Sequence, residues 1–519
     1  MSNNETVNTE KKGKVWLVGA GPGDVSLITL RGRDVLAQAE VVVYDALVRG
    51  GMMSLVPDDA ELIYAGKRSS NHTMKQDAIN SLLLEKALEG KRVVRLKGGD
   101  PFLFGRGGEE LELLVENGIE FEIVPGVTSA FAAPAYAGIP VTHRDFCRGV
   151  SVMTGHRRSN GSLDIDFGAL AASGNTLVFL MGMSTLDLIR DGLLGAGMPG
   201  DTPAAIVESG TTASQRVLTT DLAHLCETAE ENGAKAPAVT VIGGVAGLAD
   251  VYGWRGSLPL NGVRAIVTRP KELSSGLASM LRRDGAEVIE VPVIDIEPVR
   301  GNEALKNAIE LLADGGYQWV VLTSPSGVRV FMDELMKTAD LRALAGSRIA
   351  ALGKGTEAEL AKRGIHADML PSMYDGRTLG AELAKLLVPG DRVLIPRAAI
   401  GNKALNRELE KVSGVIIDDI PTYDTVCRGP SWFNAEKEVC EDDTFAMFTS
   451  ASGVRGFADA YPDLDFSKVK AICIGTMTAA EAEKRGMKVW ISEEATLAAL
   501  AERLKQAADE LGLTGSKDK

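Results

Sequence analysis

A glycine-rich turn near the start of the chain constrains the fold most strongly. Its residues, Gly19-Ala20-Gly21-Pro22-Gly23-Asp24, stand between an apolar run, Val15–Val18, and a helical pattern that begins at Ser26. A short apolar run of this kind is typical of a buried parallel strand. Glycines between a strand and a helix let the backbone pass close to a ligand. The turn therefore predicts an α/β fold with a ligand-binding loop after its first strand.

This turn does not match the dinucleotide-binding fingerprint, although it begins like one. Asp24 stands where the third glycine of G-x-G-x-x-G belongs. A second strand, Val41–Tyr44, ends in Asp45, an acidic residue suited to holding a ribose, but the glycine pattern before it is wrong. We therefore expect no NAD site.

Two stretches of different texture follow one another in the first half. The stretch from Lys14 to about Asp145 predicts alternating elements, with strands at 15–18, 41–44, 61–64, 92–96 and 121–124 and helices at 26–38, 74–89 and 107–117. Residues 150–250 predict a second lobe, with strands at 151–154, 176–181, 204–208 and 238–242 and helices at 184–194 and 219–232. A cleft between two lobes is the usual place for a ligand.

Composition excludes several classes of protein. The 519 residues predict about three to five compact units. Five scattered cysteines without a C-x-x-C pair indicate neither a metal site nor a disulfide framework, so we expect a cytoplasmic protein. A net charge of −14 disfavours nucleic-acid binding, and the apolar runs are too short and too interrupted for a membrane span. The first fourteen residues are polar and contain no apolar segment, so we expect no signal peptide. One locally basic stretch indicates either a site for an anionic substrate or a solvated loop; it contains Arg144, Arg148, His156, Arg157 and Arg158.

The second half contains an internal repeat. Its matching segments are Val321–Arg329 with Met447–Arg455, Ile349–Thr356 with Ala471–Thr478 and, more faintly, Ala265–Arg269 with Val393–Arg397. A repeat with this order predicts two lobes with one βα plan, and the repeat alone places them one after the other. We expect residues 1–13 to be disordered, 256–262 to form a linker and 512–519 to form a tail.

Two long motifs in the first half resemble the signatures of the tetrapyrrole methyltransferases. The first is Val18–Gly23 followed by Leu27–Gly32, and the second is Val94–Phe102 followed by Phe104–Glu110. Within that family the sequence looks most like uroporphyrinogen-III C-methyltransferase. The resemblance implies a two-lobed enzyme over 14–255, with lobes at about 14–145 and 150–250. It also implies a homodimer and transfer of a methyl group from S-adenosylmethionine, which leaves S-adenosylhomocysteine.

The same resemblance implies the site residues of the first half. It places the cofactor at Pro22, Gly98, Gly99, Asp100, Leu103, Thr128, Ser129, Met181, Gly210 and Ala238, and it makes Asp45 and Lys67 the catalytic base and acid. Read alone, Met181 is as consistent with core packing, Gly98–Asp100 with an ordinary turn, Asp45 with a turn carboxylate and Lys67 with a solvated charge. We add Arg106 as a grip for a substrate carboxylate, because a guanidinium matches carboxylate geometry. His143 and Arg144 are possible helpers.

The second half, 263–511, resembles uroporphyrinogen-III synthase. The repeated Thr-Ser-x-x-Gly-Val segments, the two glycine-rich turns and Pro421–Val426 carry the resemblance. It implies two parallel α/β lobes joined by strands, one from 263–296 plus 426–511 and the other from 299–421. It also implies Tyr423 as proton donor, with Thr478 near the cleft; packing between lobes is the alternative for Tyr423. We add Arg269, Ser324, Lys354, Arg397 and Ser450 as carboxylate grips.

Together the two resemblances imply a bifunctional enzyme that cyclises hydroxymethylbilane to uroporphyrinogen III and methylates it twice to precorrin-2. Siroheme-synthase relatives in this family carry an added dehydrogenase and chelatase module. Nothing in this sequence matches that module, so we expect neither nicotinamide binding nor ferrochelation. Three alternatives stay open. They are a methylase for another acceptor, a methyltransferase whose synthase half is inactive, and a tetrapyrrole-binding carrier or sensor.

Overall fold

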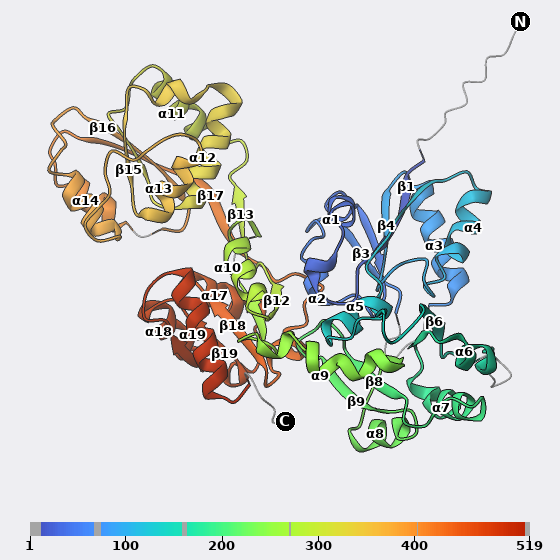
Figure 1. Cartoon of the computed structure of the whole chain (residues 1–519). Helices are drawn as coiled ribbons and strands as arrows, with labels where there is room; N and C mark the ends of the chain where they lie inside the picture. Colours follow the sequence, from blue (N-terminus) through green and yellow to red (C-terminus); the bar gives the residue numbers. More distant parts are fainter. Residues whose placement is uncertain (1–11, 67–73, 158–162, 269–270, 402, 514–519) are drawn as a thin grey trace, which may run out of the picture. The chain divides into compact units, whose positions relative to one another are not determined.

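The structure, a computed structural model, describes residues 12–66, 74–157, 163–268, 271–401 and 403–513. Most of the segment expected to be disordered, 1–13, and most of the expected tail, 512–519, therefore lie outside the described residues. The chain forms two compact units. The first unit contains the described residues up to Pro292 together with those from Gly429 onward, and the second contains Val293–Arg428. Four five-stranded sheets make up these units, three in the first and one in the second (Figure 1).

The first sheet is parallel and covered on both faces, in the order β3-β2-β4-β1-β5. Val15 and Leu17 of β1 pack on one face with helices α3 and α4, and Val18 packs on the other with α1 and α2. Figure 1 shows these two helix layers. The elements are β1 Lys14–Gly19, η1 Val25–Leu27, α1 Leu30–Leu36, β2 Val41–Tyr44, α2 Gly50–Met53, β3 Glu61–Tyr64, α3 Gln76–Leu88, β4 Arg92–Lys97, α4 Gly107–Glu116, β5 Glu120–Val124 and α5 Ser129–Tyr136.

The second sheet is mixed, in the order β6-β7-β10-β8-β9, with only β6 and β7 parallel. The helix expected at 219–232 is wrong at its start. Residues 216–221 form β9, antiparallel to β8, because Val217, Thr219 and Thr220 favour an extended backbone. The elements are β6 Val150–Thr154, α6 Phe167–Ser173, β7 Thr176–Leu180, η2 Met183–Thr185, α7 Leu186–Gly195, β8 Pro203–Glu208, β9 Arg216–Asp221, α8 Leu225–Glu231, β10 Ala238–Ile242, η3 Gly244–Leu248, α9 Ala249–Tyr252 and η4 Arg255–Ser257.

The third sheet combines strands that precede the second unit in the sequence with strands that follow it. All its strands are parallel, in the order β12-β11-β18-β19-β20. Its core contains Val267, Met447 and Ile472, one residue from each of its three central strands. The elements are β11 Arg264–Val267, α10 Lys271–Arg283, β12 Glu287–Glu290, α16 Ala435–Val439, β18 Thr444–Phe448, α17 Ala451–Ala460, η6 Phe466–Lys468, β19 Lys470–Cys473, α18 Thr476–Lys484, β20 Lys488–Ile491 and α19 Leu497–Glu510.

The fourth sheet, in the second unit, has the order β13-β17-β16-β14-β15 and is parallel except at β13. Its elements are β13 Ile294–Pro298, α11 Glu303–Ala313, β14 Trp319–Leu322, α12 Pro325–Thr338, η5 Leu341–Leu344, β15 Arg348–Ala351, α13 Lys354–Ala361, α14 Gly376–Leu383, β16 Arg392–Ala398, α15 Ala404–Leu409 and β17 Ile416–Cys427. The expected α/β fold class is confirmed in both units. No helix among the described residues is long and apolar enough to cross a membrane.

Candidate active sites

Three glycine loops meet at the carboxyl edge of the first sheet. They follow β1, β4 and β5, the three adjacent strands at that side of the sheet. A Cβ on Gly19 would lie 2.5 Å from the Gly126 Cα, and a Cβ on Gly126 would lie 2.2 Å from the Gly99 carbonyl oxygen. Gly21 and Gly99 exchange backbone hydrogen bonds of 3.2 and 2.7 Å. Gly19 and Gly126 have no room for a Cβ, and Gly21 and Gly99 have φ angles of +75° and +68° that favour glycine, so the edge presents backbone rather than side chains.

Asp100 ties two of these loops together. One carboxylate oxygen accepts hydrogen bonds from the backbone nitrogens of Phe102 at 2.8 Å and Leu103 at 3.2 Å. The other accepts from the Gly126 nitrogen at 3.0 Å. The carboxylate therefore fixes the loop after β4 against the loop after β5.

A loop of the second sheet completes this edge. The backbone nitrogen of Asp24 donates to Thr211 Oγ1 at 3.2 Å, and a Cβ on Gly23 would lie 2.9 Å from Thr212 Cγ2. A Cβ on Gly210 would lie 2.4 Å from the Ala133 Cβ of α5. The loop after β8 is therefore seated on the first glycine-rich turn and on α5.

Asp45 stands at the same edge, directly after β2. Its Oδ1 accepts a hydrogen bond from the Leu47 nitrogen at 3.0 Å, and its Oδ2 lies 3.6 Å from a guanidinium nitrogen of Arg95. The Asp45 side chain is 25% exposed, whereas that of Arg95, on β4, is 4% exposed. The partly exposed Asp45 carboxylate is thus held by the buried Arg95 guanidinium.

Sequence reasoning missed this buried charge cluster. Glu110 of α4 is fully buried, and its Oε1 lies 2.7 Å from Lys97 Nζ and 3.1 Å from Arg95 Nε. Burial, and then the positive charge of Arg95, lower the pKa of Lys97. The alternation in Val94-Arg95-Leu96-Lys97 was the available signal, because residues two apart on a strand share one face. Two cations on one face of an interior strand require a buried acid.

The second unit has a polar pair at the edge of its own sheet. The buried Tyr423 hydroxyl lies 2.9 Å from Ser324 Oγ. Ser324 caps α12 by accepting a hydrogen bond from the Gly327 nitrogen at 2.9 Å. Burial raises the pKa of Tyr423, so its phenol keeps its proton at neutral pH. The pair offers a hydroxyl donor beside a helix N-terminus.

Comparisons with known proteins match both halves. The profile of "Tetrapyrrole (Corrin/Porphyrin) Methylases" matches residues 14–226, and that of "Uroporphyrinogen-III synthase HemD" matches 275–502. The porphyrin biosynthesis protein HemD of Ruminiclostridium josui is 44% identical over 494 residues, covering 95% of this chain and 97% of that protein. The chain belongs to the fused tetrapyrrole methylase and uroporphyrinogen-III synthase family. It is an enzyme of tetrapyrrole biosynthesis with a methyltransferase half and a synthase half.

Two further relatives each match about half of this chain. Siroheme synthase 2 of Klebsiella pneumoniae is 51% identical over 245 residues, 47% of this chain and 53% of that protein. The chain therefore matches about half the length of that siroheme synthase. Uroporphyrin-III C-methyltransferase from Thermus thermophilus, solved in complex with S-adenyl homocysteine, is 38% identical with a TM-score of 0.40, covering 46% of this chain and 100% of that chain.

The structure brings most of the expected cofactor residues of the methylase half to the converging loops. Leu103 packs with the core of the second sheet, and Thr128 caps α5. Met181 follows β7 with 51% of its surface exposed, which rules out plain core packing. The residues in or beside these loops are Pro22, Gly98, Gly99, Asp100, Leu103, Thr128, Ser129 and Gly210, and Ala238 begins the neighbouring β10.

The other charged candidates of the methylase half are dispersed. Arg106 precedes α4 with a left-handed backbone, φ 57°, and pairs with Glu109. A substrate carboxylate must therefore compete with that glutamate. Lys67 and Arg158 lie outside the described residues. His143 packs against Phe146 with ring centroids 5.0 Å apart.

The candidates of the synthase half divide between the two units. Arg397 already forms a close ion pair with Asp419, its Nε 2.5 Å from the carboxylate, so it is not a free grip. Lys354 begins α13 with an exposed side chain. Ser450 caps α17 in the first unit, and Thr478 is buried in α18 of the same unit. Arg269 lies outside the described residues.

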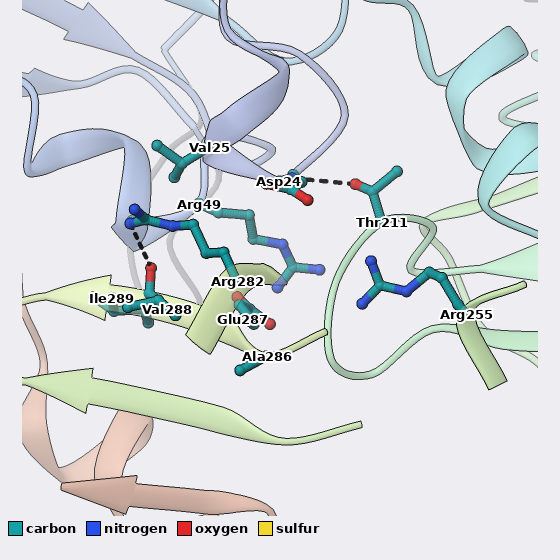
Figure 2. A pocket seen from close by; sticks show the side chains of 12 residues that line it. Asp24, Val25, Arg49, Thr211, Arg255, Arg282, Ala286, Glu287, Val288 and Ile289 are labelled. Atoms are coloured by element: carbon teal, nitrogen blue, oxygen red, sulfur yellow. Dashed lines mark hydrogen bonds between the residues drawn. The ribbon is translucent and has the colours of Figure 1, made fainter. Parts of the chain in front are cut away.

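A pocket lies beside the first glycine-rich turn, between the methylase half and β12 (Figure 2). Most of its charged groups have partners within the protein. Glu287 accepts a hydrogen bond from the Ala213 nitrogen at 2.9 Å, and Arg282 pairs with Glu290 at 2.8 Å. The first of these contacts holds β12 to the methylase half, and the second holds α10 to β12. The lining residues are Gly23, Asp24, Val25, Arg49, Gly51, Thr211, Arg255, Arg282 and Ala286–Ile289.

Proposed function

We propose that this chain makes uroporphyrinogen III from hydroxymethylbilane and then methylates it twice with S-adenosylmethionine to give precorrin-2. The observation that carries the proposal is the backbone cradle of Gly19, Gly99 and Gly126 in a chain that contains both family halves. Consistent with its family, we propose that the enzyme acts in the cytoplasm as a homodimer joined through the methylase half.

The cradle suits S-adenosylmethionine, which supplies a methyl group on an activated sulfonium. Methyl transfer breaks that carbon–sulfur bond and forms a carbon–carbon bond to a pyrrole carbon, so the protein must mainly align the two reactants. A side chain at Gly126 would already clash with the protein itself, which is consistent with close approach of backbone to a bulky ligand. Asp100 keeps the cradle closed by joining its loops.

Asp45 is our candidate for the proton acceptor. A proton must leave the methylated pyrrole system, and a carboxylate at the strand edge within reach of solvent can take it. Its exposed side faces outward while Arg95 holds its other side. Lys67 remains our expected proton donor, and Arg106 our expected grip for a substrate acetate or propionate.

In the synthase half, Tyr423 is our candidate for the proton donor. Cyclisation begins when the hydroxyl of hydroxymethylbilane leaves as water, which breaks a carbon–oxygen bond and leaves a cation for a ring carbon to attack. The Tyr423 phenol, like any tyrosine at neutral pH, is protonated, and burial raises its pKa further, so it can donate a hydrogen bond to that hydroxyl. Ser324 holds the phenol in place.

An anaerobic assay tests the whole proposal. The purified chain is given hydroxymethylbilane and S-adenosylmethionine, and S-adenosylhomocysteine release and pigment absorbance are followed. We expect precorrin-2 without any added synthase. Methylation only when uroporphyrinogen III is supplied would identify a methyltransferase with an inactive synthase half. Saturable binding of uroporphyrin without turnover of either substrate would identify a carrier or sensor.

A further inference from the structure

Glu110 connects the two parts of the methylase half that carry its candidate chemistry. It belongs to α4, whose preceding residue is Arg106 and whose first turn contains Glu109. Its Oε1 accepts from Lys97, from Arg95 and, at 3.3 Å, from Gln76 Nε2 of α3. Arg95 in turn reaches Asp45. One buried oxygen thus joins the start of α4 to the cation that supports Asp45.

Both strand cations are almost fully buried. The Lys97 side chain is 6% exposed, and a guanidinium nitrogen of Arg95 also donates to the Val43 and Leu96 carbonyls at 3.3 and 3.2 Å. Val43 belongs to β2, the strand that ends beside Asp45. The Arg95 guanidinium therefore spans from Glu110 to β2 and has little freedom to move away from Asp45.

Packing alone does not explain this buried charge cluster. Burying three ionisable groups, Glu110, Arg95 and Lys97, costs more free energy than burying apolar side chains of the same size, and such apolar side chains often stabilise a core equally well or better. Among the described residues, Glu110 Oε2 is buried with no hydrogen-bond partner, an additional cost. The rest of β4 that faces the cores is apolar, with Val93, Val94 and Leu96 fully buried. The charged cluster is confined to the end of β4 next to the site.

We propose that Glu110 is a positioning residue for methyl transfer, which holds Arg95 against Asp45 and fixes the start of α4 that presents Arg106. The inference rests on the proposed function, because it concerns the turnover step assigned to Asp45. Glu110 touches neither reactant. Its loss is expected to lower kcat rather than to weaken cofactor binding, since its side chain contacts Arg95, Lys97 and Gln76 and none of the cradle glycines.

The test must allow for a folding defect, because Glu110→Gln alone leaves two buried cations without their carboxylate. We therefore pair it with Lys97→Met, so that the cluster stays neutral and Arg95 retains Asp45 as its counter-ion. The full chain is assayed for methylation of supplied uroporphyrinogen III, for S-adenosylhomocysteine affinity by calorimetry and for folding by circular dichroism. We expect kcat to fall about 10–100-fold in the double variant, as for a misplaced catalytic geometry, with the affinity for S-adenosylhomocysteine within about twofold.

Conservative and control variants complete the design. Arg95→Lys keeps the charge and is expected to retain more kcat than Arg95→Met. Glu40→Gln removes a carboxylate that pairs with Arg92 at the other end of β4, 3.2 Å away, and is expected to leave kcat unchanged.

Three results would overturn separate steps of this proposal. A folded double variant with unchanged kcat, or one that loses cofactor affinity in parallel, would overturn the positioning role of Glu110. If Asp45→Asn retains full turnover, the proton-acceptor assignment fails first and takes this inference with it. If the unmodified enzyme methylates no uroporphyrinogen III, the proposed function itself is wrong.

Discussion

Replacing Gly126 by alanine is the sharpest test of the backbone cradle. The new Cβ would lie 2.2 Å from the Gly99 carbonyl oxygen and 2.7 Å from the Gly19 Cα, both backbone atoms. Real Cβ contacts are essentially never shorter than 3.0 Å, so the loop after β5 must retreat by at least 0.8 Å from Gly99, the difference between 2.2 and 3.0 Å. Asp100 opposes that retreat through its 3.0 Å hydrogen bond to the Gly126 nitrogen. Overpacking of this kind costs about 1–3 kcal/mol.

The cost should appear in ligand binding, because a ligand that needs the closed cradle must bear the strain. At about 1.4 kcal/mol for each factor of ten, we expect the Kd for S-adenosylhomocysteine to rise about 5–150-fold by calorimetry. Gly108→Ala is the matched control. A Cβ there meets no atom within 4 Å, and alanine in α4 should be neutral or stabilising by about 0.5–1 kcal/mol. A Gly126→Ala protein with unchanged affinity would refute the cradle.

Three other changes test separate features. Arg31, then Trp16 and Lys14, lower the pKa of Glu122 from 4.5 to about 2, so its stabilising effect is complete above about pH 4.5 and is lost as pH falls toward 2. Glu122→Gln should therefore lower Tm at pH 6 but little at pH 2; an equal loss at both would contradict the ion pair. Tyr423→Phe should slow cyclisation about 10–100-fold with methylation unchanged, and equal rates would make Tyr423 a packing residue. Deleting 293–428 and joining Pro292 to Gly429 through about two residues is feasible because Ile294 and Cys427 pair in β13 and β17, and it should abolish cyclisation but preserve S-adenosylhomocysteine binding. A folded deletion variant that still cyclises hydroxymethylbilane would contradict the assignment of the synthase chemistry to this half.

The strands of the first sheet could be predicted because each is a short apolar run between turn residues, and both faces of a doubly wound sheet need apolar side chains. The strand β9 could not, because its alternation is weak and its acidic and polar neighbours also suit a helix start. Its pairing with β8 adds to the extended preference of Val217, Thr219 and Thr220 and favours a strand over a helix start.

The candidate site residues also divide into those that the sequence predicts and those that it does not. Loop residues such as Gly99 and Asp100 follow from a local motif, although each also makes a hydrogen bond to a distant loop, Gly99 to Gly21 and Asp100 to Gly126. Glu110 could not be predicted from its own surroundings, because a glutamate near a helix start is usually a solvated residue that favours the dipole. Its burial follows from β4, where the partners are Arg95 and Lys97. The ion pair between Arg397 and Asp419 could not be predicted either, because the two residues lie on different, neighbouring strands.

The internal repeat explains how one scaffold yields an asymmetric second half. In the third sheet the order is β12-β11-β18-β19, and in the fourth it is β17-β16-β14-β15, so repeated segments occupy equivalent places. Ser450 and Ser324 are therefore counterparts, and each caps a helix by accepting from a glycine nitrogen three residues later. Their other partners differ: Ser450 Oγ lies 2.9 Å from Ser452 Oγ, whereas Ser324 Oγ lies 2.9 Å from the Tyr423 hydroxyl. β17 makes this difference, because it continues to Cys427 and carries Tyr423 past the point where its four-residue counterpart β12 ends. Of the two capping serines, Ser324 thus gains a phenol partner and Ser450 does not, which is the kind of asymmetry that a single proton donor requires.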